Sequence, residues 1–314
     1  MSNWSDLQYI AIVGVGRSGT SLLMSMLNAH PDVAFPPEFH FINQHLAQKP
    51  EATLNEAVAR LQADARFARL GMDLAEAVRP FTHNQQPFTM PALYRQILLA
   101  YAQQQNVAII GDKAPKYVEY LPVIRQIAPD AKIIHLIRDP RDVYLSRTKA
   151  AWSANRSDTA QFLAYRAQYA LGRSQGPPLF GENYLEVQYE NLLAQPEITL
   201  RSICDLLQIP YFSQMLAFAS SAQELVAQDE LAWKKETFGP LLTNNMNKWQ
   251  RELTPPQTAR VEAACRPAFT DGLYQAAQAY PTFSGRLTNG AMSLLSRLYQ
   301  SRIIYKNRQI CRRL

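Results

Sequence analysis

The sequence predicts a three-layer α/β/α fold in which helices cover both faces of a central parallel sheet. Short β-like runs alternate with helical patterns along the chain, and a glycine-rich turn joins the first run to the first helix. The 314 residues are 47% apolar and 18% charged, a composition that suits a chain with a buried core. We therefore expect one domain over residues 1–285 and a basic C-terminal helix or tail over residues 286–314.

Four runs are typical of strands, and a helical pattern follows each of them. Pro122 is expected to bend or delay the second helix, whereas Asp139 and Pro140 are suited to begin the third. The fourth strand, from residue 183, runs into a helix that continues to about Leu207. The first three strands are expected at residues 9–14, 106–113 and 131–139, and their helices at 20–30, 117–128 and 140–152.

Two stretches interrupt this alternation. Residues 41–105 hold helical patterns without a strand, and residues 208–250 mix helix and loop. Segments inserted at the carboxyl ends of parallel strands usually wall the ligand site. We therefore interpret both stretches as covers on the substrate side rather than as separate domains.

The positive charge of the chain is concentrated near its C-terminal end. After Asp271 there is no acidic residue, while seven of the 32 lysines and arginines lie there, so the preceding residues carry 25 basic and 26 acidic groups. A nucleic-acid-binding domain would spread its charge over a folded face, so we expect no nucleic acid partner. The cysteines (Cys204, Cys265 and Cys311) form no disulfide or zinc pattern, and the first residues do not read as a signal peptide. Both observations favour a reducing, cytoplasmic location.

The segment "GVGRSGTS", residues 14–21, has the spacing of a phosphate-binding loop between a strand and a helix. Backbone N–H groups at such a helix N-terminus converge on an anion, and Arg17 adds a cation that neutralises a transferring group. Thr20 stands where the Walker A motif has its lysine, which removes a main clamp on the γ-phosphate. A nucleotide-dependent kinase is therefore a distant alternative, and a turn without a ligand is the purely structural one.

In this loop the chain resembles the PAPS-dependent sulfotransferases, whose fold is similar to that of P-loop kinases. Their loop holds the 5′-phosphosulfate of 3′-phosphoadenylyl sulfate (PAPS). The stretch "GVGRSGTSLLMSMLNAHPDV" is most similar to their tyrosylprotein, glycan and bacterial branches. The resemblance implies an O-sulfotransferase that uses PAPS, releases PAP and needs no metal. It assigns the phosphosulfate to the loop residues Arg17, Ser18, Gly19, Thr20 and Ser21.

Further motifs extend the resemblance to about residue 265. In "HLIRDPRDVYLSR", Arg138 ends a strand and Ser146 follows eight residues later, which resembles the pair that clamps the 3′-phosphate of the cofactor. Three weaker matches also admit structural readings, such as a solvated lysine or a core tyrosine. They imply Lys113 of "GDKAPKY" near the sulfuryl group, Tyr189 of "VQYENL" beside the adenine, and Lys248 of "NKWQREL" on the cofactor, with Trp249 nearby.

Sulfuryl transfer to a hydroxyl needs a base for the proton and cations for the developing charge. The tyrosylprotein branch has a glutamate 21 residues after its loop arginine, which implies Glu38 as the base and leaves His40 as its rival. Arg17 and Lys113 would stabilise the transferring group. A structural role for Glu38, as a helix cap or in orienting the acceptor, is the alternative. We expect His30 and His135 to be structural, and the histidines show no metal spacing.

The acceptor is the least constrained part of the prediction. We favour a carbohydrate or glycoconjugate hydroxyl, followed by a small hydroxylated metabolite or a phenol. The secretory anchor and disulfides of the tyrosylprotein branch are not found, which argues against a tyrosine peptide. Several aromatic side chains are expected in or beside the covers. They could stack on a sugar or a phenol, but we expect most of them to be packing residues: Phe39, Phe41, Trp152, Trp233 and Phe238.

Two questions stay open: how the C-terminal tail is arranged, and whether the chain is an enzyme or only a binding module. Leucines and isoleucines alternate with arginines after Gly290, which suits a helix packed on the body or one lying on an anionic membrane surface. The second reading would place the protein at the inner face of a membrane. A non-catalytic anion- or glycan-binding module is disfavoured because Arg17, Lys113 and Glu38 are all present.

Overall fold

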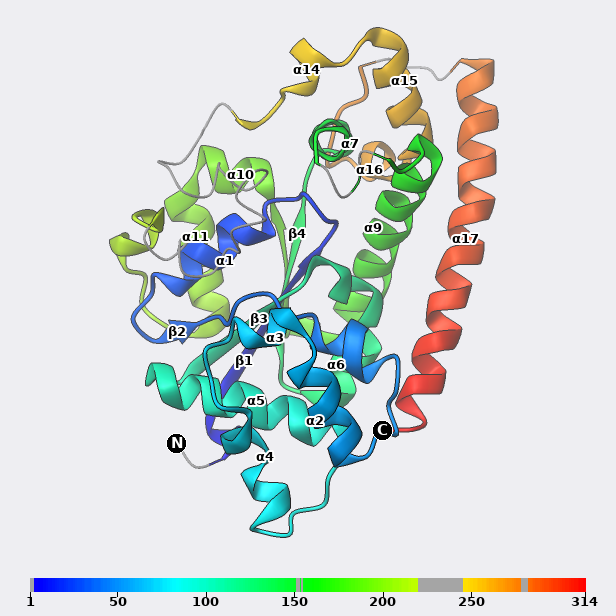
Figure 1. The fold of residues 1–314 in the computed structure, drawn as a ribbon. Coiled ribbons are helices and arrows are strands. Elements are labelled where there is room, and N and C mark those ends of the chain that lie inside the picture. The colour runs from blue at the N-terminus through cyan, green and yellow to red at the C-terminus, as the bar shows by residue number, and fades with distance from the viewer. Residues whose placement is uncertain (1–2, 151–152, 154, 220–244, 278–281) are drawn as a thin grey trace.

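The computed structural model describes residues 3–150, 153, 155–219, 245–277 and 282–314 and confirms the predicted fold class (Figure 1). A parallel five-stranded sheet with the order β2-β3-β1-β4-β5 lies between layers of helices. The strands are β1 (Gln8–Gly14), β2 (Val33–Ala34), β3 (Ile109–Lys113), β4 (Lys132–Ile137) and β5 (Tyr184–Gln188).

Alternate residues of the central strand β1 enter two different cores. Tyr9, Ala11 and Val13 pack on one face of the sheet, and Ile10 and Ile12 pack on the other. Because side chains alternate along a strand, a run that is apolar throughout marks a strand covered on both faces. The first face carries α5 (Met90–Gln105), α6 (Leu121–Ile127) and α9 (Asp158–Phe180), and the second carries α1 (Thr20–Asn28), α10 (Tyr189–Ala194) and α11 (Pro196–Leu207).

Prolines decide several element boundaries. The helix predicted over residues 117–128 divides into a 3₁₀ turn (Pro115–Tyr120) and α6, which starts late because Pro122 fits only the first helical turn. The helix predicted to continue to Leu207 breaks at Gln195, since Pro196 begins α11. Asp139 accepts the N–H of Arg141 and caps α7 (Pro140–Thr148), as predicted.

Some elements have no counterpart in the sequence prediction, among them β2 and α9. β2 is two residues long, too short to show an alternating pattern. The long helix α9 contains Gly172 and Gly176, and these positions lie against the rings of His135 and Tyr184. A side chain at either position would collide with these rings of the sheet. Close packing therefore explains why glycine, which usually argues against a helix, stands inside α9.

The first predicted cover is helical, as expected. It contains a π-helical turn (Ile42–Leu46), α2 (Leu54–Gln62), α3 (Ala65–Ala68), α4 (Leu74–Thr82) and α5. Most of the second cover, together with Trp152, Trp233 and Phe238, lies outside the described residues. Phe39 and Phe41 are packing residues, one of the two roles expected for these aromatics, because both rings are buried and stack against Tyr94 in the core.

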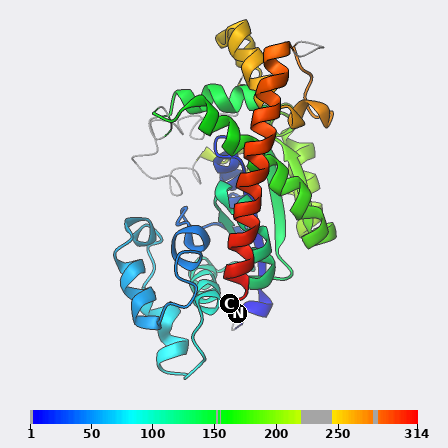
Figure 2. The same cartoon turned by 90° about the vertical axis from the view of Figure 1, so that its right-hand side faces the viewer.

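The C-terminal region adds α14 (Trp249–Glu252), α15 (Pro255–Ala264), α16 (Pro267–Thr270) and the long helix α17 (Phe283–Cys311). Figure 2 shows α17 running along one side of the body, where it packs against α6, α9 and α15. The tail therefore packs on the body, one of the two arrangements predicted for it. Within the described part of the chain, none of the helices combines the length and apolar character that crossing a bilayer requires.

Candidate functional site

The carboxyl ends of four strands bring the predicted site residues to one edge of the sheet. Gly14 ends β1 and leads into the loop, and Lys113 ends β3. Arg138 follows β4 directly, and Tyr189 follows β5. Parallel strands all end on the same side of the sheet. Gly14 of "GVGRSGTS" and Tyr189 of "VQYENL", which are 175 positions apart, therefore lie at the same end.

Backbone conformation shapes the loop at this edge. Gly14 has a φ of 154°, and a Cβ at this position would lie 2.4 Å from the Leu136 carbonyl oxygen. Gly19 has a φ of 90°, and its Cβ would meet the ring of Tyr189 at 2.2 Å. Arg17 adopts a positive φ of 79°, a strained conformation for a residue with a side chain. The loop then leads into α1, which begins at Thr20. The first backbone N–H groups of this helix form a site suited to an anion.

The two predicted phosphate clamps meet in the structure. Arg17 Nε donates to Ser146 Oγ over 3.0 Å, and Arg138 Nη1 donates to the Arg17 carbonyl oxygen over 3.2 Å. Both guanidinium groups thus lie between the loop and α7. Two buried polar atoms, Ser18 Oγ and Arg138 Nε, have no hydrogen-bond partner within the described residues. Donors left in this way suit an anionic ligand with several oxygen atoms.

Tyr189 forms the floor beneath Arg138. The guanidinium carbon of Arg138 lies 4.3 Å from the ring centroid, and the same ring closes against Gly19. Asn245, which the sequence did not single out, donates from Nδ2 to the Tyr189 hydroxyl over 2.9 Å. Its carbonyl oxygen accepts from Arg138 Nη2 over 2.9 Å. Asn245 therefore fixes the arginine and the tyrosine relative to each other.

Asp142 connects the predicted Lys248 segment to the site. Its carboxylate accepts the N–H groups of Asn247, at 2.7 Å, and Trp249, at 2.9 Å. These bonds hold Lys248 next to α7, close to the Arg138 side of the site. The Trp249 ring faces Arg141 at 3.6 Å, so it packs beside the site rather than inside it.

Arg147 is a second residue that the sequence analysis missed. It is buried, and its Nε donates to the Gly16 carbonyl oxygen over 3.2 Å. Burial lowers the pKa of Arg147 to about 10, which still leaves it charged near neutral pH. It fixes the loop from the side of α7. Nothing in "VYLSRTKA" marks this arginine, because its partner is a backbone atom 131 positions earlier.

The second half of the site is an acid–base group around Glu38. The Lys113 ammonium donates to Glu38 Oε2, and it also donates to Ser21 Oγ over 3.3 Å. Glu38 Oε1 lies 3.3 Å from His40 Nε2. The side chain of Lys113 is 1% exposed, that of Glu38 11% and that of His40 26%. A carboxylate at the edge of solvent is thus joined by a buried cation to the phosphate-binding loop.

Buried tyrosines and an aspartate support this group from inside the sheet. Tyr94 donates to Asp112 Oδ2 over 2.7 Å. The Tyr117 hydroxyl accepts the N–H of Ile42, just beyond the Glu38 segment, over 3.2 Å. Burial raises the pKa of Asp112 to about 6, and the charge of Glu38 adds to the rise. The bond between Tyr117 and Ile42 thus ties the segment that follows Glu38 to the 3₁₀ turn after β3.

We expect the stability of the folded chain to fall as the pH rises from about 4 to about 6 through Asp112. The folded pKa of about 6 exceeds the ordinary aspartate pKa of 3.8, so the folded state binds the proton more tightly than the unfolded state does. The Asp112 carboxyl makes its full contribution to the free energy of unfolding below the lower of the two pKa values. About 3 kcal/mol of that contribution is lost by pH 7. Urea unfolding of the wild type and Asp112→Asn between pH 4 and 7 will show a smaller decline for the variant. Asp205→Asn on the surface is the control, and parallel profiles for wild type and Asp112→Asn would refute the assignment.

Comparison with known proteins identifies the family. The sequence profile described as the sulfotransferase family matches residues 9–214, which include the loop, Glu38, Lys113, Arg138 and Tyr189. This chain belongs to the sulfotransferase family. The predicted resemblance is confirmed, and the family match disfavours the nucleotide-dependent kinase that was the distant alternative.

Curated relatives of this sulfotransferase include proteins named for tyrosine sulfation. It is 28% identical to protein-tyrosine sulfotransferase 1 of Danio rerio, over 67% of this chain and 56% of the relative. It is 25% identical to protein-tyrosine sulfotransferase A of Caenorhabditis elegans, over 66% and 52% of the two chains. The matches thus span about half the length of these relatives.

Solved structures share the fold of this sulfotransferase. The sulfotransferase domain of the Synechococcus PCC 7002 olefin synthase superposes with a TM-score of 0.61 at 21% identity, covering 86% of this chain and 96% of that domain. The sulfotransferase domain of the curacin biosynthetic pathway gives 0.56 at 19% identity, covering 82% and 96%. Both likenesses show that the three-layer architecture is the one used by sulfotransferase domains.

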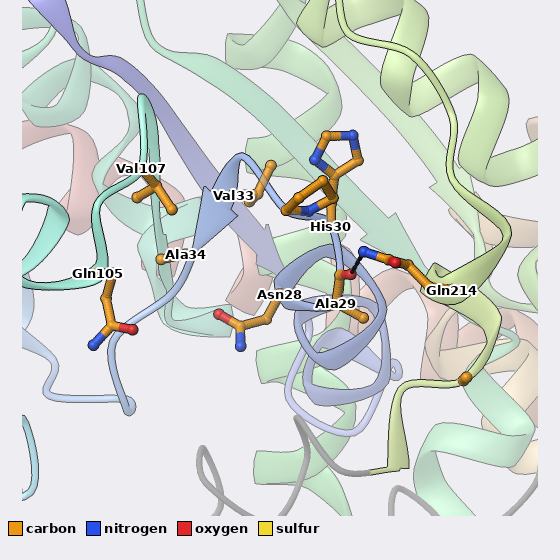
Figure 3. A pocket seen from close by; sticks show the side chains of 10 residues that line it. Asn28, Ala29, His30, Val33, Ala34, Gln105, Val107 and Gln214 are labelled. Atoms are coloured by element: carbon orange, nitrogen blue, oxygen red, sulfur yellow. Dashed lines mark hydrogen bonds between the residues drawn. The ribbon is translucent and has the colours of Figure 1, made fainter.

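A cavity of about 550 Å³ lies at the opposite end of α1 from the loop (Figure 3). It is lined by Asn28, His30, Gln105 and Gln214, and Gln214 donates to the Ala29 carbonyl oxygen over 2.9 Å.

His30 bonds the Pro210 carbonyl oxygen and the N–H of Asp32, which is a structural role. His135 is fully buried in β4 and bonds the Tyr184 hydroxyl. Neither histidine approaches Glu38, in agreement with the expectation that both are structural.

Proposed function

We propose that this sulfotransferase transfers the sulfuryl group of PAPS to a hydroxyl of a carbohydrate or glycoconjugate, with Glu38 as the general base. The observation that carries the proposal is the line of contacts from Glu38 through Lys113 to Ser21. It places a carboxylate and a buried cation beside the anion-binding turn. A base and a positive charge meeting at an anion site are what hydroxyl-to-sulfuryl transfer requires.

Several features of the site fit PAPS. The N–H groups at the start of α1 and the loop residues from Arg17 to Ser21 would hold the phosphosulfate. Arg138 and Ser146 would hold the 3′-phosphate. The Ser18 hydroxyl and Arg138 Nε, which have no partner among the described residues, match the oxygen atoms of such groups. Tyr189 would pack beside the adenine, and Lys248 would approach from the side of Arg138 and α7. PAPS supplies the sulfuryl group that the protein side chains lack.

The chain's own residues divide the chemical work. Glu38 removes the proton of the acceptor hydroxyl, and its partial exposure leaves it accessible to an acceptor from solvent. Lys113 stabilises negative charge beside Ser21, and Arg17 does so from the side of α7. His40 lies within 3.3 Å of Glu38 and would orient that carboxylate or pass on its proton. Fixed charges of this kind lower a barrier because they need no reorganisation during the reaction.

The acceptor proposal is supported by the groups next to Glu38. Phe39 and Phe41 turn into the core, while the partly exposed His40 turns toward Glu38. Arg69 donates to the Glu38 carbonyl oxygen over 2.7 Å. Among the described residues adjoining Glu38 in sequence, polar rather than aromatic groups therefore face an acceptor, which suits a polyhydroxylated molecule. A tyrosine side chain is the second candidate, because the matched curated relatives are named protein-tyrosine sulfotransferases.

Melting experiments test the cofactor directly. PAP at about 100 times its Kd should stabilise the folded chain by about 2.7 kcal/mol and raise its Tm. The shift should disappear in Arg138→Ala and persist in Arg201→Ala, an exposed arginine of α11. A shift with ATP and Mg²⁺ but none with PAP would contradict the proposed cofactor.

The acceptor is tested by incubating the protein with radiolabelled PAPS and three acceptor sets. These are neutral oligosaccharides, small alcohols and phenols, and tyrosine peptides. Label transferred to oligosaccharides, and lost in Glu38→Gln, would support the proposal. Label on tyrosine peptides alone would replace the carbohydrate acceptor by the second candidate while leaving the cofactor and the base in place.

A further inference from the structure

The long helix α17 presents an apolar stripe to solvent along most of its length. At 3.6 residues per turn, five large side chains fall on one face, opposite the face that packs on the body. These side chains are between 60% and 78% exposed. We call them the outer stripe: Phe283, Leu287, Leu294, Leu298 and Tyr305. Figure 2 shows that α17 lies at the surface of the molecule over its whole length.

The opposite face fixes the rotation of α17. Met292, Ile303 and Ile310 are buried against the body. Asn307 Nδ2 donates to the Glu119 carbonyl oxygen over 2.7 Å, and the Tyr299 hydroxyl donates to Glu119 Oε1 over 2.9 Å. Turning the helix to bury the outer stripe would leave these buried polar groups without partners, a costly change. The stripe therefore stays outward.

Cations border the outer stripe on both sides. Arg286, Arg297 and Arg308 follow one edge at intervals of 11 residues, and Arg302 lies on the other edge. All four are exposed, and within the described residues none has a carboxylate at ion-pair distance. The one described ion pair of the helix region joins Arg313 to Glu51 over 3.5 Å, at the far end. The helix itself contains no acidic residue.

We propose that the outer face of α17 docks on an anionic lipid surface, with the outer stripe in the interface and the arginines on the headgroups. An amphipathic helix with large apolar side chains between cations is the chemistry that binds such surfaces. Charge decides against a second copy of this chain. Two such faces packed together would bring their arginines into contact without any carboxylate to compensate them.

Vesicle flotation with the full chain tests the proposal. Vesicles of phosphatidylcholine with phosphatidylglycerol should bind the protein at about 0.1 M salt and release much of it at about 0.5 M, because the Debye length shortens. Pure phosphatidylcholine should bind it far less. Leu294→Asp/Leu298→Asp should abolish flotation. Arg286→Gln/Arg297→Gln/Arg308→Gln should weaken it about a hundredfold, from a contribution of about fivefold for each arginine.

The control variants make the same kinds of substitution at exposed positions away from α17. Ile198→Asp changes an exposed apolar residue of α11, and Arg79→Gln/Arg201→Gln removes exposed cations of α4 and α11. These controls should float as the wild type does. All of the variants should keep the wild-type Tm, because the substituted side chains face solvent. Equal flotation of the Leu294/Leu298 variant, equal binding to neutral vesicles, or a dimer in light scattering that this variant dissolves would overturn the proposal.

Discussion

Replacing Glu38 by glutamine is expected to lower kcat about 100- to 10,000-fold, the usual contribution of a general base. The amide keeps the shape of the side chain and still accepts a hydrogen bond from Lys113, but it cannot take a proton from the acceptor. Binding of PAP should be unchanged, because Glu38 contacts Lys113 and His40 rather than the phosphate clamps. Turnover with labelled PAPS and calorimetric titration with PAP measure the two quantities separately.

The variant His40→Asn is the matched control for this prediction. His40 lies 3.3 Å from Glu38 and is the rival base, so the pair of variants decides between them. With Glu38 as the base, His40→Asn should lower kcat by less than about tenfold. A large loss in His40→Asn together with a small loss in Glu38→Gln would assign the proton transfer to the histidine.

The variant Lys113→Met is expected to lower the free energy of unfolding by about 3–5 kcal/mol, the cost of breaking a buried ion pair. Lys113 is 1% exposed, and its ammonium group is in direct contact with the Glu38 carboxylate. Removing it leaves Glu38 beside Asp112, a second carboxylate whose charge already interacts with it. Chemical denaturation at neutral pH, followed by far-ultraviolet circular dichroism, gives the free energy.

The double variant Lys113→Met/Glu38→Gln separates the ion pair from simple packing loss. Once both charges are gone, neither group leaves the other without its counter-charge, so the double variant should be more stable than Lys113→Met alone. The coupling between the two substitutions should then be large and favourable. Strictly additive losses would mean that the two side chains contribute independently, and the electrostatic account of this pair would be wrong.

The amino-acid sequence by itself determined the fold class and the half of the site that we propose to hold the cofactor phosphates. The alternation of apolar runs with helical patterns predicted the parallel sheet, because each strand and helix can be recognised from the short-range periodicity of its own residues. The loop from Gly14 to Ser21 is likewise a local motif, since its anion site comes from consecutive backbone N–H groups. The spacing of Arg138 and Ser146 belongs to a single strand–helix junction, so it was visible without the rest of the chain.

The tertiary structure alone decided how the remaining groups meet. The contact of Glu38 with Lys113 spans 75 positions, and that of Asn245 with Arg138 spans 107. Arg147 and Asp142 act through backbone atoms, which carry no sequence signal. The rotation of α17, which sets its leucines outward, depends on buried bonds to Glu119. Such contacts follow from the packing of the whole chain, because the energy that selects them is shared among many distant residues rather than stored in any short segment.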